Sequence, residues 1–257
     1  MRIAVIAEKI RRRETPIYNF LYNIAKAVRG FELPYVPGIH DVLYHERSLR
    51  VNLWRSLWRV FYYQPLFRSR CHTCGKGLYI INSGQGLPVI EGDLKIDVGN
   101  NVSIYDRSTF GALTIGSNPR LIIGENTQIA SSVAILVGNR VSIGNNCIIS
   151  CTMIADNPGH NLDYRKRYLK LEKEKIEKIN IGDHVWAATQ SIIIGRVNVG
   201  TGAIISPRAV VRKNVPPFCI VNGDPARVIR KLPIPDEIRA NIKPAEYEEY
   251  LQVELKN

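Results

Sequence analysis

Residues 181–211 read IGDHVWAATQSIIIGRVNVGTGAIISPRAVV, and an apolar side chain returns at every sixth position of this stretch. The residues that mark the period are Ile181, Ala187, Ile193, Val199, Ile205 and Val211. Such a period fits neither an α-helix, with about 3.6 residues per turn, nor a strand that alternates between two faces. It is typical of a parallel β-helix, in which each hexapeptide forms one flat side and the marking residue points into the core.

The same period occurs earlier in the chain, with one two-residue slip. Its markers there are Val98, Ile104, Ile123, Ile129, Ile135, Ile143, Ile149 and Ala155. A glycine follows the marker in Val98-Gly99, Ile115-Gly116, Ile123-Gly124, Ile143-Gly144, Ile181-Gly182 and Val199-Gly200. Asn or Asp comes soon after most of these glycines, as expected where a corner needs left-handed backbone. A β-propeller is excluded because its blade repeat runs to about 40 residues.

The chain has 257 residues, of which 45% are hydrophobic and 23% charged, as in ordinary soluble globular proteins. Its formal net charge of +12 is unusual. Such a charge indicates an anionic partner, which can be a phosphorylated cofactor, a polyanion or a membrane surface. We expect no nucleic-acid partner.

Five cysteines form an odd set without the density of a disulfide scaffold, which indicates a reducing compartment. No stretch approaches the roughly 20 apolar residues that span a bilayer. Basic residues follow the first apolar patch, whereas in a signal peptide they precede it. We therefore expect a cytoplasmic protein, with peripheral contact at the inner face of the cell membrane as a further expectation.

Three regions follow from these patterns. Residues 1–75 are predicted to be a basic helical region, with one helix over 17–28 closed by Gly30 and a second over 46–63. Residues 76–232 are predicted to be the β-helix. Residues 233–257 are predicted to be a helical cap, in which a helix over 236–252 covers the open last coil.

The helix over 46–63 is basic and amphipathic. Its aromatic residues Trp54, Trp58 and Phe61 accompany the arginines at positions 47, 50, 55 and 59. Such a helix suits an anionic membrane surface. The alternative is that it is buried against the β-helix.

One excursion, residues 156–180, interrupts the repeat. An insertion of this length must leave a regular coil, and excursions from rigid scaffolds are where function concentrates. It contains His160, one of two histidines in the repeat region. The other, His184, occupies a corner position of a hexapeptide and is predicted to be a turn residue exposed to solvent.

Residues 181–229 carry the motifs IGDHVW, VVRKNVPP and NGDPA, and this stretch resembles the C-terminal signature of hexapeptide-repeat acetyltransferases. The resemblance is closest to the polysaccharide and sugar O-acetyltransferases, which include maltose and colanic acid acetyltransferases. It implies a left-handed parallel β-helix, a homotrimer, acetyl-CoA as donor and a catalytic histidine on a loop that leaves the helix. Two segments depart from the family: Ala187-Ala188-Thr189 and Ile205-Ser206-Pro207.

His160 falls where that family has its catalytic histidine. Acetyl transfer to a hydroxyl needs a base near neutral pH, and histidine is the side chain whose ordinary pKa lies there. Asp156 or Asp163 is the candidate to orient the imidazole. For both aspartates a turn role is an open alternative.

The resemblance also implies where the cofactor binds. Ala188 and Ser206 are expected beside the pantetheine, and Trp186 is expected as a wall for the pantetheine or for the acceptor. Cations late in the chain, among them Arg208, Lys213 and Arg230, are candidates to pair with the phosphates of coenzyme A. A solvated basic face is the alternative for these cations, and a surface aromatic is the alternative for Trp186.

Cys71-His72-Thr73-Cys74 raises the question of zinc. A structural zinc site has four ligands, and no second pair at ligand spacing follows. Two free thiols are the favoured interpretation, and we expect no metal. A zinc enzyme of the γ-carbonic anhydrase type needs three histidines in the coils, which His160 and His184 do not supply.

The sequence thus favours an acetyl-CoA-dependent O-acetyltransferase that acts on a sugar of a surface polysaccharide or its precursor. Two alternatives remain open. One is an amino-sugar N-acetyltransferase of the same fold, or an enzyme with another acyl donor. The other is a β-helix without catalytic activity that binds a glycan or a membrane.

Overall fold

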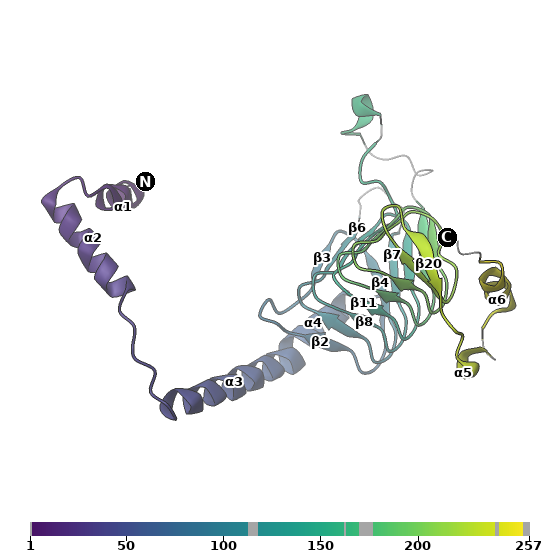
Figure 1. The fold of residues 1–257 in the computed structure, drawn as a ribbon, viewed down its shortest axis with the longest axis horizontal. Coiled ribbons are helices and arrows are strands. Elements are labelled where there is room, and N and C mark those ends of the chain that lie inside the picture. The colour runs from purple at the N-terminus through teal and green to yellow at the C-terminus, as the bar shows by residue number, and fades with distance from the viewer. Residues whose placement is uncertain (1, 113–117, 162, 170–176, 240–241, 254–257) are drawn as a thin grey trace. The chain divides into compact units, whose positions relative to one another are not determined.

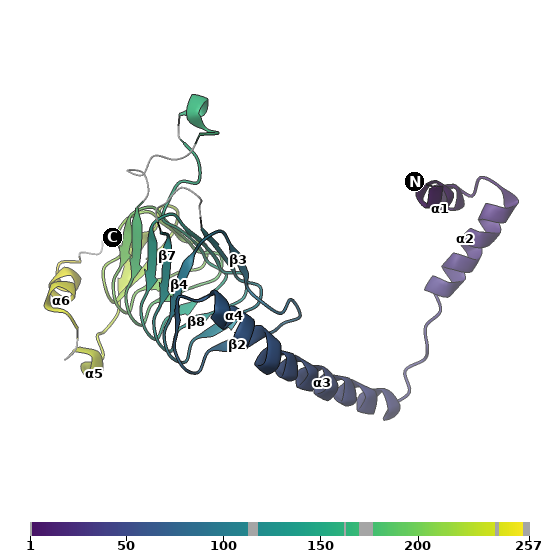
Figure 2. The ribbon, with the colours of Figure 1, turned by 180° about the vertical axis from the view of Figure 1, so that it is seen from behind.

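The computed structural model of the protein describes residues 2–112, 118–161, 163–169, 177–239 and 242–253. Its strands form three sheets that are almost wholly parallel (Figures 1 and 2). Sheet A contains β1 (Thr73–Cys74), β4 (Lys95–Val98), β7 (Arg120–Ile123), β10 (Arg140–Ile143), β13 (Lys178–Ile181) and β16 (Val197–Val199). A mainly parallel β structure is as the sequence predicted.

Sheet B contains β2 (Tyr79–Ile81), β5 (Ser103–Tyr105), β8 (Gln128–Ile129), β11 (Ile148–Ile149), β14 (Trp186–Ala187), β17 (Ile204–Ile205), β19 (Cys219–Asn222) and β20 (Arg227–Lys231). Sheet C contains β3 (Val89–Glu91), β6 (Thr109–Ala112), β9 (Ala134–Val137), β12 (Met153–Ala155), β15 (Ile192–Ile194) and β18 (Val210–Val211). From β1 to β18 consecutive strands enter sheets A, B and C in turn, so the chain winds as a three-sided coil. Each turn has an A–B, a B–C and a C–A corner.

The period-marking residues point into this coil. Ile181, Ala187, Ile193, Val199, Ile205 and Val211 are all buried, as are all eight earlier markers. In each sheet the markers of successive turns are paired in register, for example Ile123 with Ile143 and Ile143 with Ile181. The prediction that these residues form a continuous stacked core is confirmed. The pair Ile115-Gly116 lies outside the described residues.

The glycines after the markers are required by close stacking. A Cβ on Gly144 would lie 2.6 Å from the carbonyl carbon of Gly182 in the next turn. The left-handed backbone occurs two residues later, at Asn101, Asn126, Asn146 and His184, where φ is between 55° and 57°. The A–B corner therefore uses glycine for its small volume, and the left-handed conformation falls on asparagine in three turns and on His184 in the fourth.

The chain divides into two compact units, residues 1–52 and 53–257. The first unit contains α1 (Arg2–Arg12), α2 (Pro16–Arg29) and most of α3 (Ile39–Trp58). Helix α2 matches the predicted helix over 17–28, with the Thr15 hydroxyl accepting a hydrogen bond from the Tyr18 N–H and Gly30 at its end. None of the described helices combines the length and the apolar character needed to cross a bilayer.

The predicted helix over 46–63 begins earlier and changes type before its end. Helix α3 starts at Ile39, where the Asp41 carboxylate accepts a hydrogen bond from the Gly38 N–H at 3.0 Å. It continues directly into the π-helical turn η1 (Arg59–Tyr63) and into α4 (Gln64–Arg70). Arg59 lies over the ring of Tyr79 in β2, which ties this segment to sheet B.

The single helix predicted over 236–252 is wrong, because two short helices take its place. They are α5 (Asp236–Arg239) and α6 (Pro244–Leu251), and residues 240–241 between them lie outside the described residues. Helix α6 packs beside the last turns of the coil (Figure 1). The Tyr250 hydroxyl donates to the Leu232 carbonyl at 2.9 Å, and the Tyr250 ring contacts Phe218 edge-on.

Because neighbouring turns approach so closely at Gly144, Gly144→Ala should lower the free energy of unfolding by roughly 1–3 kcal/mol through overpacking against backbone. Denaturant unfolding followed by circular dichroism measures the change. Ser103→Ala, on the outer face of sheet B, is the control and should change stability by less than about 0.5 kcal/mol. Equal stability of the wild type and Gly144→Ala would contradict the stacking argument.

Candidate functional site

The excursion leaves the coil at Asp156, just after β12, and returns at β13. The Asp156 carboxylate is fully buried and accepts hydrogen bonds from the backbone N–H groups of Gly138, Asn139 and Arg140, at 2.6, 2.8 and 2.9 Å. The Asp156 carbonyl accepts another from the Glu177 N–H at 3.0 Å. This one residue therefore ties the C–A corner of the previous turn to both ends of the excursion.

His160 lies beyond this root and is exposed to solvent. Its Nδ1 is 3.3 Å from the Arg167 carbonyl oxygen. A carbonyl oxygen only accepts, so this contact requires the proton on Nδ1 and leaves the lone pair of the neutral imidazole on Nε2. The ring therefore presents Nε2 as its basic atom.

The two aspartates considered for orienting His160 have other hydrogen-bond partners. Asp156 is bonded to backbone as described, and the Asn157 side-chain amide donates to it at 2.9 Å. Asp163 caps the 3-10 turn η2 (Tyr164–Lys166) by accepting from the Arg165 N–H at 3.0 Å. The imidazole is held by the carbonyl of Arg167, a contact that no side-chain pattern in the sequence indicates. Residues 162 and 170–176 of the excursion lie outside the described residues.

Four of the six residues predicted to bind the cofactor lie together on two successive turns. Trp186 begins β14 and pairs in register with Ile204 of β17, with 48% of its surface exposed. The Ala188 N–H donates to the Ile205 carbonyl at 2.9 Å, which places Ala188 beside Ser206 at the B–C corner. Arg208 Nε donates a hydrogen bond to Gln190 Oε1 of the previous turn at 3.1 Å.

Lys213 and Arg230 lie elsewhere. Lys213 is exposed at the C–A corner, just past β18, so it shares an edge of the coil with the root of the excursion. Arg230 is exposed in β20, opposite Ile220, and lies on sheet B three strands from Trp186. Within one chain, Trp186 and the excursion thus lie on different sides of the coil.

His184 lies at the A–B corner with left-handed backbone, as predicted for a turn residue. It lines a groove of about 600 Å³ between that corner and the C-terminal helices. Three acidic residues, Asp183, Glu246 and Glu249, also line this groove, and the Glu246 carboxylate accepts from the Thr201 hydroxyl at 3.1 Å. Acidic walls disfavour the phosphates of a coenzyme.

Glu177 is a further candidate residue of the site, and the sequence analysis did not single it out. Its Oε2 atom is buried and has no hydrogen-bond partner among the described residues. It stands where the excursion rejoins the coil, next to Asp156. A buried carboxylate oxygen without a hydrogen-bond partner is unusual in a folded protein. In the sequence, the only feature that could have drawn attention to Glu177 is its position at the end of a charged run.

The segment Cys71-His72-Thr73-Cys74 has free thiols. Burial raises the pKa of the Cys71 thiol to about 12, so this sulfur stays protonated near neutral pH. His72 Nδ1 lies 3.0 Å from the Asp97 carboxylate. Within the described ranges, no cluster of three or more His, Cys, Asp and Glu side chains is arranged to hold a metal ion.

Comparison with known proteins shows similarity to acetyltransferases. The chain is 33% identical over 128 residues to "Putative acetyltransferase YJL218W" of Saccharomyces cerevisiae, covering 50% of this chain and 63% of that protein. It is 31% identical over 110 residues to a chloramphenicol acetyltransferase of Escherichia coli, covering 38% and 51%. It is 30% identical over 117 residues to the galactoside O-acetyltransferase of Escherichia coli K12, covering 46% and 56%. These relatives are acetyltransferases.

The chain spans less than two thirds of the length of the curated relatives that it matches. No protein-family profile matches it. Among solved structures it is similar to the N-acyltransferase AntD of Bacillus cereus, in complex with dTDP and 3-hydroxybutyryl-CoA. The TM-score is 0.52 at 19% identity, covering 74% of this chain and 96% of that one. This similarity shows a shared fold.

The hydrogen bonds of Asp156 lead to a stability prediction. Asp156→Asn replaces one acceptor oxygen by an NH₂ group that faces backbone donors, so it should lower the free energy of unfolding by about 1–3 kcal/mol. Denaturant unfolding measures this loss, and the rate of limited proteolysis within 156–180 should rise. Asp93→Asn, an exposed carboxylate at another C–A corner and outside the excursion, is the control. Unchanged proteolysis of Asp156→Asn would contradict the assigned role.

Proposed function

We propose that this protein is an acetyl-CoA-dependent O-acetyltransferase with the left-handed β-helix of the hexapeptide-repeat family, and that its acceptor is a sugar hydroxyl of a surface polysaccharide or its precursor. The observation that carries the proposal is the excursion at Asp156. It presents a histidine with Nδ1 on a carbonyl and its lone pair on Nε2. Similarity to acetyltransferases, one of them a galactoside O-acetyltransferase, supports the reaction class.

In this proposal His160 Nε2 is the general base. It accepts the proton of the acceptor hydroxyl as the oxygen attacks the thioester carbonyl of acetyl-CoA. The tetrahedral intermediate carries an oxyanion, which backbone N–H groups stabilise. When the intermediate collapses, the C–S bond breaks, the coenzyme A thiolate takes the proton from the imidazolium, and the acetyl ester remains on the acceptor.

In this proposal acetyl-CoA, the acetyl donor, binds along the strip around Trp186, which we call the donor strip. Trp186, Ala188 and Ser206 form the wall beside the pantetheine, and Arg208, Lys213 and Arg230 pair with phosphates. The coenzyme in the AntD structure supports a coenzyme A donor. No metal takes part in the proposed reaction.

The proposal includes a homotrimer. Trp186 and the excursion lie on different sides of one coil, so a single chain does not bring its base to its own donor strip. Packing of flat coil faces around a threefold axis places the excursion of one copy against the donor strip of the next. Asp156 acts in this scheme as a positioning residue that holds the root of the excursion.

N-acyl transfer is the second candidate, because AntD is an N-acyltransferase of the same fold. An amine acceptor needs the same base, so the two reactions differ only in the acceptor. Acetylation of amino sugars in place of hydroxyls would favour this candidate. A coil that binds a glycan or membrane without catalysis is the third, and it requires that acetyl-CoA is not consumed.

We also propose a cytoplasmic location and a peripheral contact between residues 46–63 and an anionic membrane. Trp54, Leu57, Trp58, Phe61 and Tyr62 line an apolar groove of about 310 Å³, and Phe61 is 77% exposed. The Arg55 guanidinium donates to the Ser83 carbonyl, so this segment is partly held against the coil while its aromatic rings remain exposed. Exposed aromatic rings suit the interfacial region of a bilayer.

His160→Ala should lower the turnover number by roughly two to four orders of magnitude, the usual effect of removing a positioned general base. Transfer from labelled acetyl-CoA to glycan fractions measures the loss. Light scattering and circular dichroism should show unchanged assembly and fold, since the side chain is exposed. His184→Ala is the matched control. If that variant were inactive and His160→Ala active, the proposed base would be wrong.

Lys213→Ala and Arg230→Ala should each weaken acetyl-CoA binding and leave the apparent affinity for the acceptor close to wild type. Removal of a cation that pairs with phosphate acts mainly on binding of that ligand in the ground state. Calorimetry with coenzyme A measures the change, and Lys76→Ala, an exposed cation in the first turn of the coil, serves as the control. Wild-type affinity in both variants would assign these two residues to a solvated face.

A further inference from the structure

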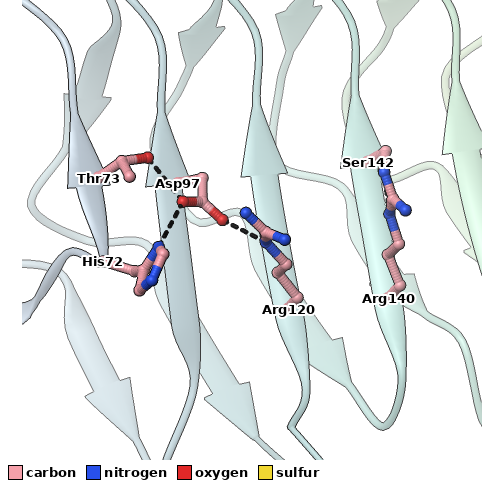
Figure 3. Close-up of polar contacts among 6 residues, drawn as sticks. All are labelled: His72, Thr73, Asp97, Arg120, Arg140 and Ser142. Carbon is pink, nitrogen blue, oxygen red and sulfur yellow. Dashed lines mark hydrogen bonds and ion pairs between the residues drawn. The ribbon is translucent and has the colours of Figure 1, made fainter.

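A row of four cations crosses the outer face of sheet A. Strand pairing places Lys95 beside Arg120, Arg120 beside Arg140, and Arg140 beside Lys178. All four residues are exposed and each begins its strand. We call this set the basic row; Figure 3 shows two of its members, Arg120 and Arg140, on neighbouring strands.

The row is only partly neutralised. The Asp97 carboxylate accepts from Arg120 Nε at 2.5 Å, and Thr73 and His72 also contact it (Figure 3). Burial raises the pKa of the Asp97 carboxyl, but these hydrogen bonds outweigh it and hold the pKa at about 2. Lys95, Arg140 and Lys178 have no ion pair with any carboxylate in the described part of the chain.

Such an arrangement has a cost in stability. Neighbouring strands lie about 4.8 Å apart, and like charges directly opposite each other destabilise a sheet. The row repeats this unfavourable pairing over three consecutive strand pairs. A bound polyanion removes the repulsion by placing negative groups between successive cations.

The row ends at the root of the excursion. The Arg140 N–H donates to the Asp156 carboxylate at 2.9 Å, and Lys178 follows Glu177, whose N–H is bonded to the Asp156 carbonyl. The C–A corner therefore carries both the cations and the segment that contains His160. A chain that lies across the row leads directly to this excursion.

Uncharged polar side chains lie beside the last two cations of the row, Arg140 and Lys178, whereas the corresponding positions of β7 and β4 hold Ile122 and Asp97. Ser142, Asn180 and Asn198 occupy consecutive strands in register, two residues after the start of β10 and β13. Arg140 Nε donates to the Ser142 hydroxyl at 3.1 Å, and the Asn180 amide donates to the Asn198 side-chain oxygen at 2.9 Å. Hydroxyl and amide groups offer both donors and acceptors, which suit the hydroxyls of a saccharide.

We propose that the basic row binds a linear glycan that carries carboxylates, so that the acceptor is an acidic polysaccharide laid across sheet A toward the excursion. This inference rests on the proposed function, because it identifies the row's ligand with the acceptor of that reaction. Cations matched to carboxylates, with hydroxyl and amide groups beside Arg140 and Lys178, distinguish such a chain from a neutral glycan and from a bare polyanion.

The test measures binding without acetyl-CoA. Calorimetry compares three probes: an oligogalacturonate, the neutral maltoheptaose, and a single-stranded oligonucleotide of equal charge. We expect the oligogalacturonate to bind most tightly and its affinity to fall as salt rises. Arg140→Gln and Lys178→Gln should each weaken it about two- to fivefold, the range for exposed ion pairs, and the double variant by about the product. Arg107→Gln, an exposed cation at a B–C corner, is the matched control and should bind as the wild type does.

Three outcomes of the binding test overturn the inference. Equal binding of maltoheptaose would show that charge plays no part, and equal binding of the oligonucleotide would assign the row to polyanions in general. Loss of affinity in Arg107→Gln as large as in Arg140→Gln would remove the row's special role. Binding without acetyl transfer contradicts the proposed function alone, whereas transfer to neutral glycans that is unaffected by Arg140→Gln and Lys178→Gln contradicts this inference alone.

Discussion

Close contact between successive turns of the coil is the constraint on which the rest of the structure depends. Neighbouring parallel strands lie about 4.8 Å apart, so each turn must follow the path of the one before it. At the A–B corner this leaves no room for a side chain, and Gly124, Gly144 and Gly182 stack almost backbone on backbone. Inside, apolar residues from all three sides of each turn fill the core, with two residues from a sheet A strand such as β10, which contributes Val141 and Ile143.

An insertion has no place in such a stack, so the segment after Asp156 must leave it. Because the chain leaves the coil here, the next turn does not stack on the C–A corner of the previous turn. The Asp156 carboxylate instead accepts hydrogen bonds from three backbone N–H groups of that corner. The same principle operates at Asp106, which is fully buried and accepts from the N–H groups of Gly84, Gln85 and Gly86. A buried carboxylate thus stabilises two corners of this coil by accepting backbone hydrogen bonds, and at Asp156 it also holds the start of the excursion in place.

Stacking also explains how charge is concentrated. Any residue type placed at the same position of successive turns becomes a row across a sheet, with a spacing set by the strands. Side chains of the row Trp186, Ile204 and Ile220 make a partly apolar strip on sheet B, whereas cations make the basic row on sheet A. The coil therefore presents side chains of one type in straight rows at a regular spacing, and such rows suit extended ligands.

The sequence by itself determined the repeat, the inward residues and the place of the excursion, because these depend on local order along the chain. It also placed His184 in a corner and His160 outside the core. The tertiary structure alone decided the basic row, since Lys95, Arg120, Arg140 and Lys178 are 25, 20 and 38 residues apart in sequence and only strand register aligns them. It also decided the partners of Asp156 and His160, because backbone N–H and C=O groups leave no mark in a sequence pattern.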